Sequence, residues 1–323
     1  MLDSLSYKTK QFFVVLIKLS IVVGAFYFIY LKLIENETLD FRVFVDFLNK
    51  KEVFSLKNIL FLLFLSIFNW FFEILKWHNL VSSITKISFK TGLEQSLGAL
   101  TASLFTPNRI GEYGAKAIYY PSELRKKVML LNLVSNMMQM AVTTVFGIIG
   151  LLFFMTQYHL EIDFKKALYA LTLLMLVGAF FLFSLQHKAF EIKGFSIKKI
   201  IDFIKNIRKT IIIKTVVFSV LRYFIFSFQL YYLLHIFGVS ISYPNAMMVI
   251  TSMYLLSSVI PSVFIFDVVI KSGVAVYLFS LIGVNELTIL SIIMIMWLLN
   301  FVLPSVFGSY YVLNFNFSKE QTE

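Results

Sequence analysis

The sequence predicts an all-α, polytopic membrane protein with about six full spans and two oppositely oriented re-entrant helical hairpins. Its composition and the lengths of its apolar runs predict this class. Hydrophobic residues make up 59% of the 323 residues and charged residues 15%, and the mean hydropathy is +0.83. Because a soluble domain carries about a quarter charged residues, this composition favours a bilayer.

Charge and cysteine content narrow the function classes. The chain has a net charge of +11 and no cysteine. In a membrane protein, an excess of Lys and Arg is typical of cytoplasmic loops and of contact with anionic lipid, so we expect no nucleic acid as a partner. Without cysteine, the chain forms no disulfide and offers no thiolate to a metal or a substrate.

Six apolar runs are long enough to cross a bilayer, which takes about 20 residues in a helix. They lie at about 11–34, 56–77, 128–155, 166–186, 212–237 and 287–314. The first is long and lacks a small-residue cleavage site, so we interpret it as a retained helix and not as a signal peptide. We therefore treat 1–323 as a single integral membrane domain.

Two further apolar regions, at about 93–120 and 245–283, are interrupted by polar residues and proline. The interruptions are Thr106-Pro107-Asn108 and Ile260-Pro261-Ser262. Each half is short, so each region is either a span with a break or a re-entrant hairpin. Non-helical backbone at membrane depth is tolerated only inside protein or beside a wet cavity, so we expect both breaks to meet a cavity.

The distribution of Lys and Arg favours re-entrant hairpins that enter from opposite sides. Basic residues precede the first span and flank 93–120 on both sides, which places the N-terminus and both ends of that hairpin in the cytoplasm. The loop 187–214 is strongly basic and is predicted to be cytoplasmic. The flanks of 245–283 are almost free of Lys and Arg, so this hairpin should enter from outside, and Lys319 returns the C-terminus to the cytoplasm.

The two interrupted regions repeat a pattern of proline, acid and lysine. The members are Pro107, Glu112 and Lys116 in the first, and Pro261, Asp267 and Lys271 in the second. In each region the lysine follows the acid by four residues, so the two share one helix face. Breaks at matching positions of two halves are the sequence feature of an inverted repeat and indicate the binding site.

Arg109 is the predicted phosphate-binding residue, since it stands at the start of a short helix, where free N–H groups and the helix dipole attract anions. Asn108 could accept as the N-cap, and Gly111 would allow close backbone approach. Glu112 would balance the charge or receive a cationic head group. The alternative is an Arg109–Glu112 bridge that merely closes the hairpin. Lys116 would add an anion contact.

Other polar residues in the apolar runs are assigned simpler roles. Arg222 is predicted to pair with Asp267 or a lipid phosphate, or else to snorkel, and Lys271 would add a second anion contact. Lys76, near the inner end of its span with Glu73, is predicted to snorkel.

Three amides in the third span, Asn132, Asn136 and Gln139, are predicted to form hydrogen bonds between helices. The four histidines are scattered, and no nucleophile, phosphate-loop or dinucleotide motif is present. We therefore expect no metal, no cofactor and no catalytic residue.

The motif at 106–112 resembles that of the lysyl-phosphatidylglycerol synthase transmembrane-region family, also called flippase-like integral membrane proteins. In that family Gly usually stands at the place of Asn108, and Arg is frequent near Lys116. The second family motif, a Pro, a Gly-rich run and a Glu, is similar to Pro261 and Asp267, although the glycines are missing here and the acid is shorter.

The resemblance covers most of the chain and implies a polytopic fold with re-entrant segments. In bifunctional members it implies lipid translocation attached to a soluble aminoacyl-transfer domain. No segment of that kind is visible, so lysyl transfer is not implied.

These features predict translocation of a lipid or lipid-linked substrate through a polar intramembrane cavity. The head group would be zwitterionic or phosphate-bearing, and the location the plasma (bacterial inner) membrane, with both termini cytoplasmic. One alternative is a membrane-embedded transferase that uses Glu112 or Asp267 as a base on a lipid-linked substrate. Another is a non-transporting accessory subunit of an envelope-lipid pathway, which would dock a partner through 187–214.

Overall fold

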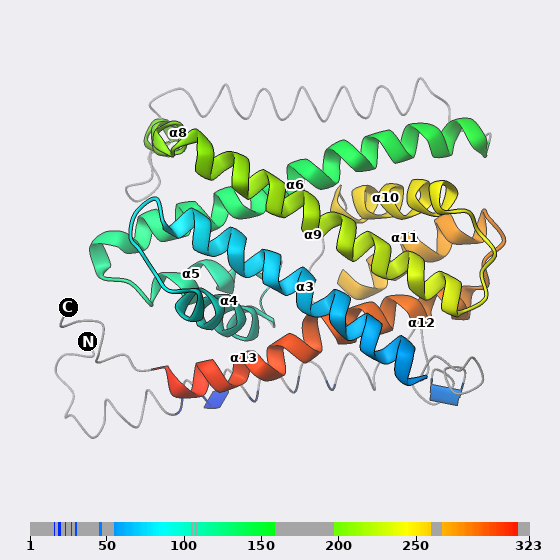
Figure 1. Cartoon of the computed structure of the whole chain (residues 1–323), viewed down its shortest axis with the longest axis horizontal. Coiled ribbons are helices and arrows are strands. Elements are labelled where there is room, and N and C mark those ends of the chain that lie inside the picture. Colours follow the sequence, from blue (N-terminus) through cyan, green and yellow to red (C-terminus); the bar gives the residue numbers. More distant parts are fainter. Residues whose placement is uncertain are drawn as a thin grey trace.

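A computed structural model describes residues 55–104, 106, 109–158, 197–259 and 267–315, together with a few isolated positions before residue 47. At 197–200, 259 and 267–271 the description covers the backbone only. Every element in this part of the chain is helical (Figure 1). The helices are α3 (Leu56–Val81), α4 (Phe89–Ser103), α5 (Gly111–Ala117), α6 (Ser122–Gln157), α8 (Ile197–Asn206), α9 (Lys209–Ile236), α10 (Tyr243–Val259), α11 (Asp267–Ser280), α12 (Glu286–Trp297), the π-helical segment η2 (Leu298–Val302) and α13 (Leu303–Asn314).

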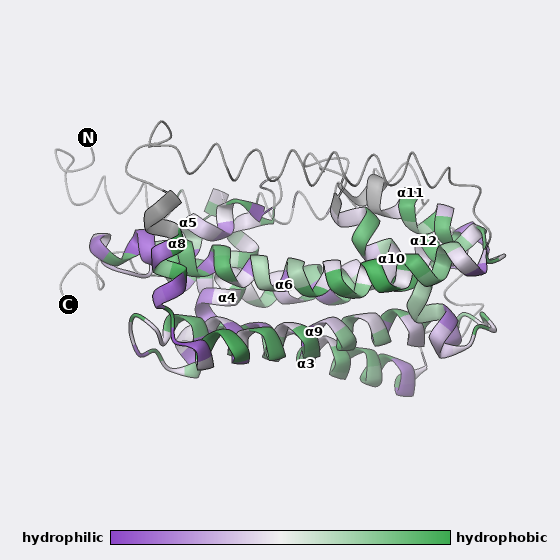
Figure 2. Cartoon of the chain, turned by 90° about the horizontal axis from the view of Figure 1, so that it is seen from above, coloured by the Kyte–Doolittle hydropathy of each residue, from purple (hydrophilic) through white to green (hydrophobic). Residues whose placement is uncertain are grey.

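Four described segments are long and apolar enough to cross a membrane: α3, α6, α9 and the run Glu286–Asn314 through α12, η2 and α13. They coincide with the spans predicted at 56–77, 128–155, 212–237 and 287–314. The spans predicted at 11–34 and 166–186 lie outside the described residues. Hydrophobic residues occupy the middle of α3, α6 and α9, and hydrophilic residues gather mostly toward the ends (Figure 2). The all-α membrane class is confirmed.

Three of the helices begin at a residue whose side chain forms an N-cap. Ser55 accepts from the Asn58 N–H at 3.4 Å, and Ser88 accepts from Thr91 at 3.1 Å. Asn285 accepts from the N–H of Leu287 at 2.9 Å. Each cap satisfies a donor that the first helical turn leaves free, so the helix can begin at that residue.

The helices pack in three principal pairs: α3 along α9, α4 along α13, and α6 along α10. Glycines permit the close approach in two of these pairs. A Cβ at Gly308 of α13 would overlap the Leu97 carbonyl and the Thr101 hydroxyl of α4, and a Cβ at Gly150 of α6 would overlap the Thr251 side chain of α10. Such small-residue contacts let helix backbones approach closely in a membrane protein.

Short helices lie at both ends of the bundle. Figure 1 places α4 and α5 at the same end as α8, and α10 and α11 at the opposite end. The first predicted interruption falls between α4 and α5, and the second between α10 and α11. The segment 187–214, predicted as a loop, contains α8 and the start of α9.

The last span is interrupted by η2. Pro304 has no N–H for the carbonyl of Asn300, and the Trp70 indole donates to that carbonyl instead, at 3.0 Å. The Asn300 side chain accepts from Asn69 and donates to Gln229, both at 2.8 Å. This π-helical segment therefore fastens the last span to α3 and α9, and such segments are frequent at functional sites.

Candidate functional site

The turn between α4 and α5 is held by Thr106. Its hydroxyl donates to the Ser103 carbonyl at 2.7 Å and accepts from the Gly111 N–H at 3.0 Å. A Cβ at Gly111 would lie 2.9 Å from Thr106 Cγ2 and 3.2 Å from Ser103 Cα. Gly111 therefore lets the start of α5 approach the end of α4.

Arg109 lies in this turn with a left-handed backbone, at a φ of 56°. A non-glycine residue in this region is strained by about 1–3 kcal/mol, and such strain clusters at binding sites. Asn108 lies outside the described residues, and the N-cap role predicted for it is wrong. The N-cap of α5 is Ile110, whose side chain cannot accept a hydrogen bond.

The short helix α5 carries a buried carboxylate held between two cations, here named the Glu112 triad (Arg109, Glu112 and Lys116). Lys116 Nζ lies 2.6 Å from Glu112 Oε1, and Arg109 Nη2 lies 2.9 Å from Glu112 Oε2. The Lys116 side chain is 1% exposed and that of Arg109 is 30% exposed. Lys116 also donates to Asn132 Oδ1 at 2.8 Å and lies 4.2 Å from the centre of the Trp77 ring, a cation–π contact.

A second carboxylate between an arginine and a lysine lies across α3 and α9, here named the Glu73 triad (Glu73, Lys76 and Arg222). Glu73 Oε2 is 2.8 Å from Lys76 Nζ and 2.7 Å from Arg222 Nη1. Arg222 also donates from Nε to Asn69 Oδ1 at 3.1 Å. Lys76 is 1% exposed, so the prediction that it snorkels is wrong: its ammonium turns into the protein because Glu73 lies on the same face.

The two triads lie within electrostatic range of each other, since Glu73 interacts with the charges of both Lys116 and Glu112. Together they hold four cations and two carboxylates, a surplus of two positive charges. Among the described residues, Arg109 Nε and Asn132 Nδ2 are buried donors without a hydrogen-bond partner. The region therefore has an excess both of positive charge and of unused donors.

The amides predicted to join helices do so. Asn132 accepts from Lys116 of α5, and Asn136 donates to the Tyr113 hydroxyl at 3.1 Å. Gln139 donates to the Ser219 carbonyl of α9 at 3.4 Å. Two of them also contact the triads, since Asn132 accepts from Lys116 and Gln139 accepts from Arg222 at 3.5 Å.

The predicted site residues separate into three groups. Arg109, Glu112 and Lys116 come together as predicted. Arg222 belongs to the same region, but its acidic partner in the structure is Glu73 of α3. The side chains of Asp267 and Lys271 lie outside the described residues, so that half of the predicted site remains a prediction.

Sequence reasoning missed the functional interest of Glu73 and Lys76. A signal was present, because an acid and a lysine three residues apart within an apolar run can share one helix face. Charged residues in such a run are costly and commonly functional, so the pair is a candidate for the site on the same grounds as Arg109 and Glu112.

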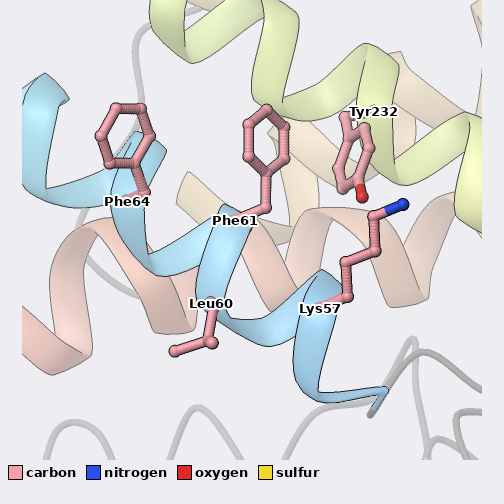
Figure 3. A pocket seen from close by; sticks show the side chains of 5 residues that line it. All are labelled: Lys57, Leu60, Phe61, Phe64 and Tyr232. Atoms are coloured by element: carbon pink, nitrogen blue, oxygen red, sulfur yellow. The ribbon is translucent and has the colours of Figure 1, made fainter.

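An open hollow of about 540 Å³ lies elsewhere, at the N-terminal end of α3 (Figure 3). Its lining residues are Lys57, Leu60, Phe61, Phe64 and Tyr232. The rings of Phe61 and Tyr232 lie 4.7 Å apart along its wall. None of these residues belongs to either triad, and Glu73 lies nine residues after Phe64 along α3, so this hollow is not part of the charged site.

No group of three His, Cys, Asp or Glu side chains that could hold a metal occurs in the part of the chain that the structure describes. The model of one protein family, the lysylphosphatidylglycerol synthase TM region, matches residues 15–308. Comparisons with curated proteins and with solved structures found no match. Because the family match covers most of the chain, the protein belongs to this family, as its motifs predicted, and is a membrane protein linked to lipid metabolism.

Proposed function

We propose that this member of the lysylphosphatidylglycerol synthase TM-region family translocates a lipid or lipid-linked amphiphile, whose head group passes the two triads. The observation that carries the proposal is the group of six charged side chains in the interior of an apolar bundle, with four cations against two carboxylates. A charge within a membrane-spanning segment costs a few kcal/mol or more and is usually retained for function.

The surplus of cations argues against a purely structural role. Ion pairs that only close a hairpin need one cation for each carboxylate, yet both Glu112 and Glu73 have two. An anionic head group would supply the missing negative charge and accept from the unused donors on Arg109 and Asn132. The strained backbone of Arg109 also favours a residue kept for binding.

The order and pairing of the helices support two re-entrant hairpins in an inverted repeat. A long helix, two short helices and a long segment recur in α3 to α6 and again in α9 to α13. If the halves correspond in this order, α3 takes the place of α9, so the α3–α9 pair corresponds to itself. In the same way, α4 corresponds to α10 and α13 to α6, so the α4–α13 pair corresponds to the α10–α6 pair. Inverted repeats in transporters permit access to one site from alternate sides.

The same reasoning extends to location and partners. The basic segments of the sequence favour the α4–α5 end as cytoplasmic, with both chain termini on that side of a bacterial inner membrane. The partners would be membrane lipids with a phosphate-bearing or zwitterionic head group. An envelope-biosynthesis protein would be a further partner if α8 and its basic flanks serve for docking.

Translocation of fluorescent lipids in proteoliposomes tests the proposal. Wild type is compared with Arg109→Ala and Glu112→Gln, and with Lys127→Ala as a matched control, since Lys127 is an exposed cation at the start of α6. We expect both site variants to lose translocation while the control retains it, with each protein shown to be folded by size-exclusion chromatography. If wild type moved no head group, the flippase-like function would be rejected. Lipid modification in detergent would then favour the transferase.

A further inference from the structure

The two triads have the same arrangement of charged groups. Each holds a carboxylate between a fully buried lysine and a partly exposed arginine: Lys116 and Arg109 on Glu112, Lys76 and Arg222 on Glu73. We infer that the site selects a doubly charged phosphate head group, a lipid phosphomonoester or diphosphate, over a phosphodiester or a zwitterion. This inference rests on the proposed function and specifies its substrate class.

Charge balance is the first argument. The described charged groups of the site come from α3, the turn before α5, α5 itself and α9, and they sum to two positive charges, while α6 contributes the neutral Asn132. A zwitterionic head group adds no net charge, and a phosphodiester adds one negative charge. A phosphomonoester above its second pKa adds close to two. In surroundings of low dielectric constant, an uncompensated charge is strongly disfavoured, so the dianion fits best.

The exposure of the cations is the second argument. Both lysines are 1% exposed and sit against their carboxylates, so they neutralise the protein's own acids. The arginine side chains are 30% exposed at Arg109 and 21% at Arg222, so they are the cations that a ligand can reach. A guanidinium presents a planar fork that matches phosphate oxygens.

The unused hydrogen-bonding capacity beside Arg109 is the third argument. Arg109 Nε and Asn132 Nδ2 are both N–H donors, buried and without a partner in the described chain. A terminal phosphate offers three acceptor oxygens, whereas a phosphodiester keeps only two that are not bridging. Neither donor suits the ammonium of a zwitterionic head group.

Short-chain lipids in detergent provide the test. The probes are dioctanoyl phosphatidic acid and farnesyl phosphate, which are phosphomonoesters on unrelated tails, with dioctanoyl phosphatidylglycerol as the phosphodiester and inorganic phosphate as the soluble source. Binding to the full chain is measured by isothermal titration calorimetry at about pH 8 and about pH 5, since the second phosphate pKa is about 6. The phosphodiester keeps its charge over this range, so any change in its binding reports on the protein.

We expect both phosphomonoesters to bind at least about tenfold more tightly than the phosphodiester at the higher pH. The ratio should fall toward one at the lower pH, because the ligand becomes a monoanion. Arg222→Gln removes one positive charge, so its ratio should fall toward one at both pH values. Phosphodiester binding by this variant shows that it is folded.

Equal or tighter binding of the phosphodiester at the higher pH would overturn the inference. The proposed function would survive that result if Arg109→Ala still abolished translocation. Inorganic phosphate binding as tightly as the lipids would overturn the lipid source. If no lipid bound and none moved in proteoliposomes, the inference and the proposed function would both fall.

Discussion

Glu112→Gln should destabilise the protein more than Lys116→Met does, although the two residues form one ion pair. In the Glu112→Gln variant the buried Lys116 ammonium has only uncharged partners, namely the introduced amide oxygen, the Asn132 oxygen and the Trp77 ring. At an effective dielectric constant of about 20, opposite charges 2.6 Å apart attract by roughly 6 kcal/mol. Desolvation offsets part of this attraction, so we expect the free energy of unfolding to fall by about 3–5 kcal/mol, as it does when other buried charges lose their charged partner.

Lys116→Met leaves Glu112 with its second cation, Arg109, at 2.9 Å. No buried charge is left without a charged partner, so we expect the free energy of unfolding to fall by only about 1.5–3 kcal/mol, the range for hydrogen bonds to charged groups. The double substitution removes both charges together. Its loss should therefore fall short of the sum of the single losses by about 1–3 kcal/mol.

Unfolding by sodium dodecyl sulfate in detergent micelles, followed by far-UV circular dichroism, measures all three variants. Lys127→Met is the matched control, because it removes an exposed lysine from α6 and should leave the transition unchanged. Strictly additive losses would refute the reasoning, since they would mean that Glu112 and Lys116 do not interact. A greater loss of stability for Lys116→Met than for Glu112→Gln would contradict the view that Glu112→Gln leaves a buried charge on Lys116 without a charged partner.

Five further substitutions are checked by the same unfolding measurement. Gly308→Ala should destabilise by about 1–3 kcal/mol, because its Cβ would overlap α4, whereas Gly114→Ala, with nothing within 4 Å, should be neutral or stabilising. Arg222→Lys should lose about 1.5–3 kcal/mol, because an ammonium cannot reproduce the fork that contacts a carboxylate and an amide. Trp70→Phe should lose about 1–3 kcal/mol, and less in a Pro304→Ala background, where a backbone N–H can reach the same carbonyl. An equal loss in both backgrounds would contradict this account.

Local patterns predicted most of the described fold. The apolar runs at 56–77 and 212–237 are close to α3 and α9, because hydrophobicity over about 20 residues depends only on neighbouring residues. The interruption at 106–108 was also visible, since proline and polar residues end a helix locally. The π-helical segment η2 was not predicted, because the indole that donates to its Asn300 carbonyl comes from a distant helix.

Half of the charged site was predictable for the same reason. Arg109, Glu112 and Lys116 lie within one short segment, so their spacing alone places them on one face. The Glu73 triad joins α3 to α9, and no local spacing indicates that Arg222 lies opposite Glu73. The burial of Lys76 was missed because a single helix does not show which of its faces other helices will cover.

The packing of α10 on α6 connects the short helix α10 with the Glu112 triad. Helix α10 packs on α6 at Gly150, and α6 also carries Asn132, which contacts Lys116 of α5. Because close-packed interfaces move as units, a shift of α10 should carry α6 and alter the Lys116–Asn132 contact. We therefore expect Gly150→Ala, which lies away from every charge of the site, to slow lipid translocation per folded molecule. An unchanged rate in a folded, destabilised variant would show that α10 and the Glu112 triad act independently.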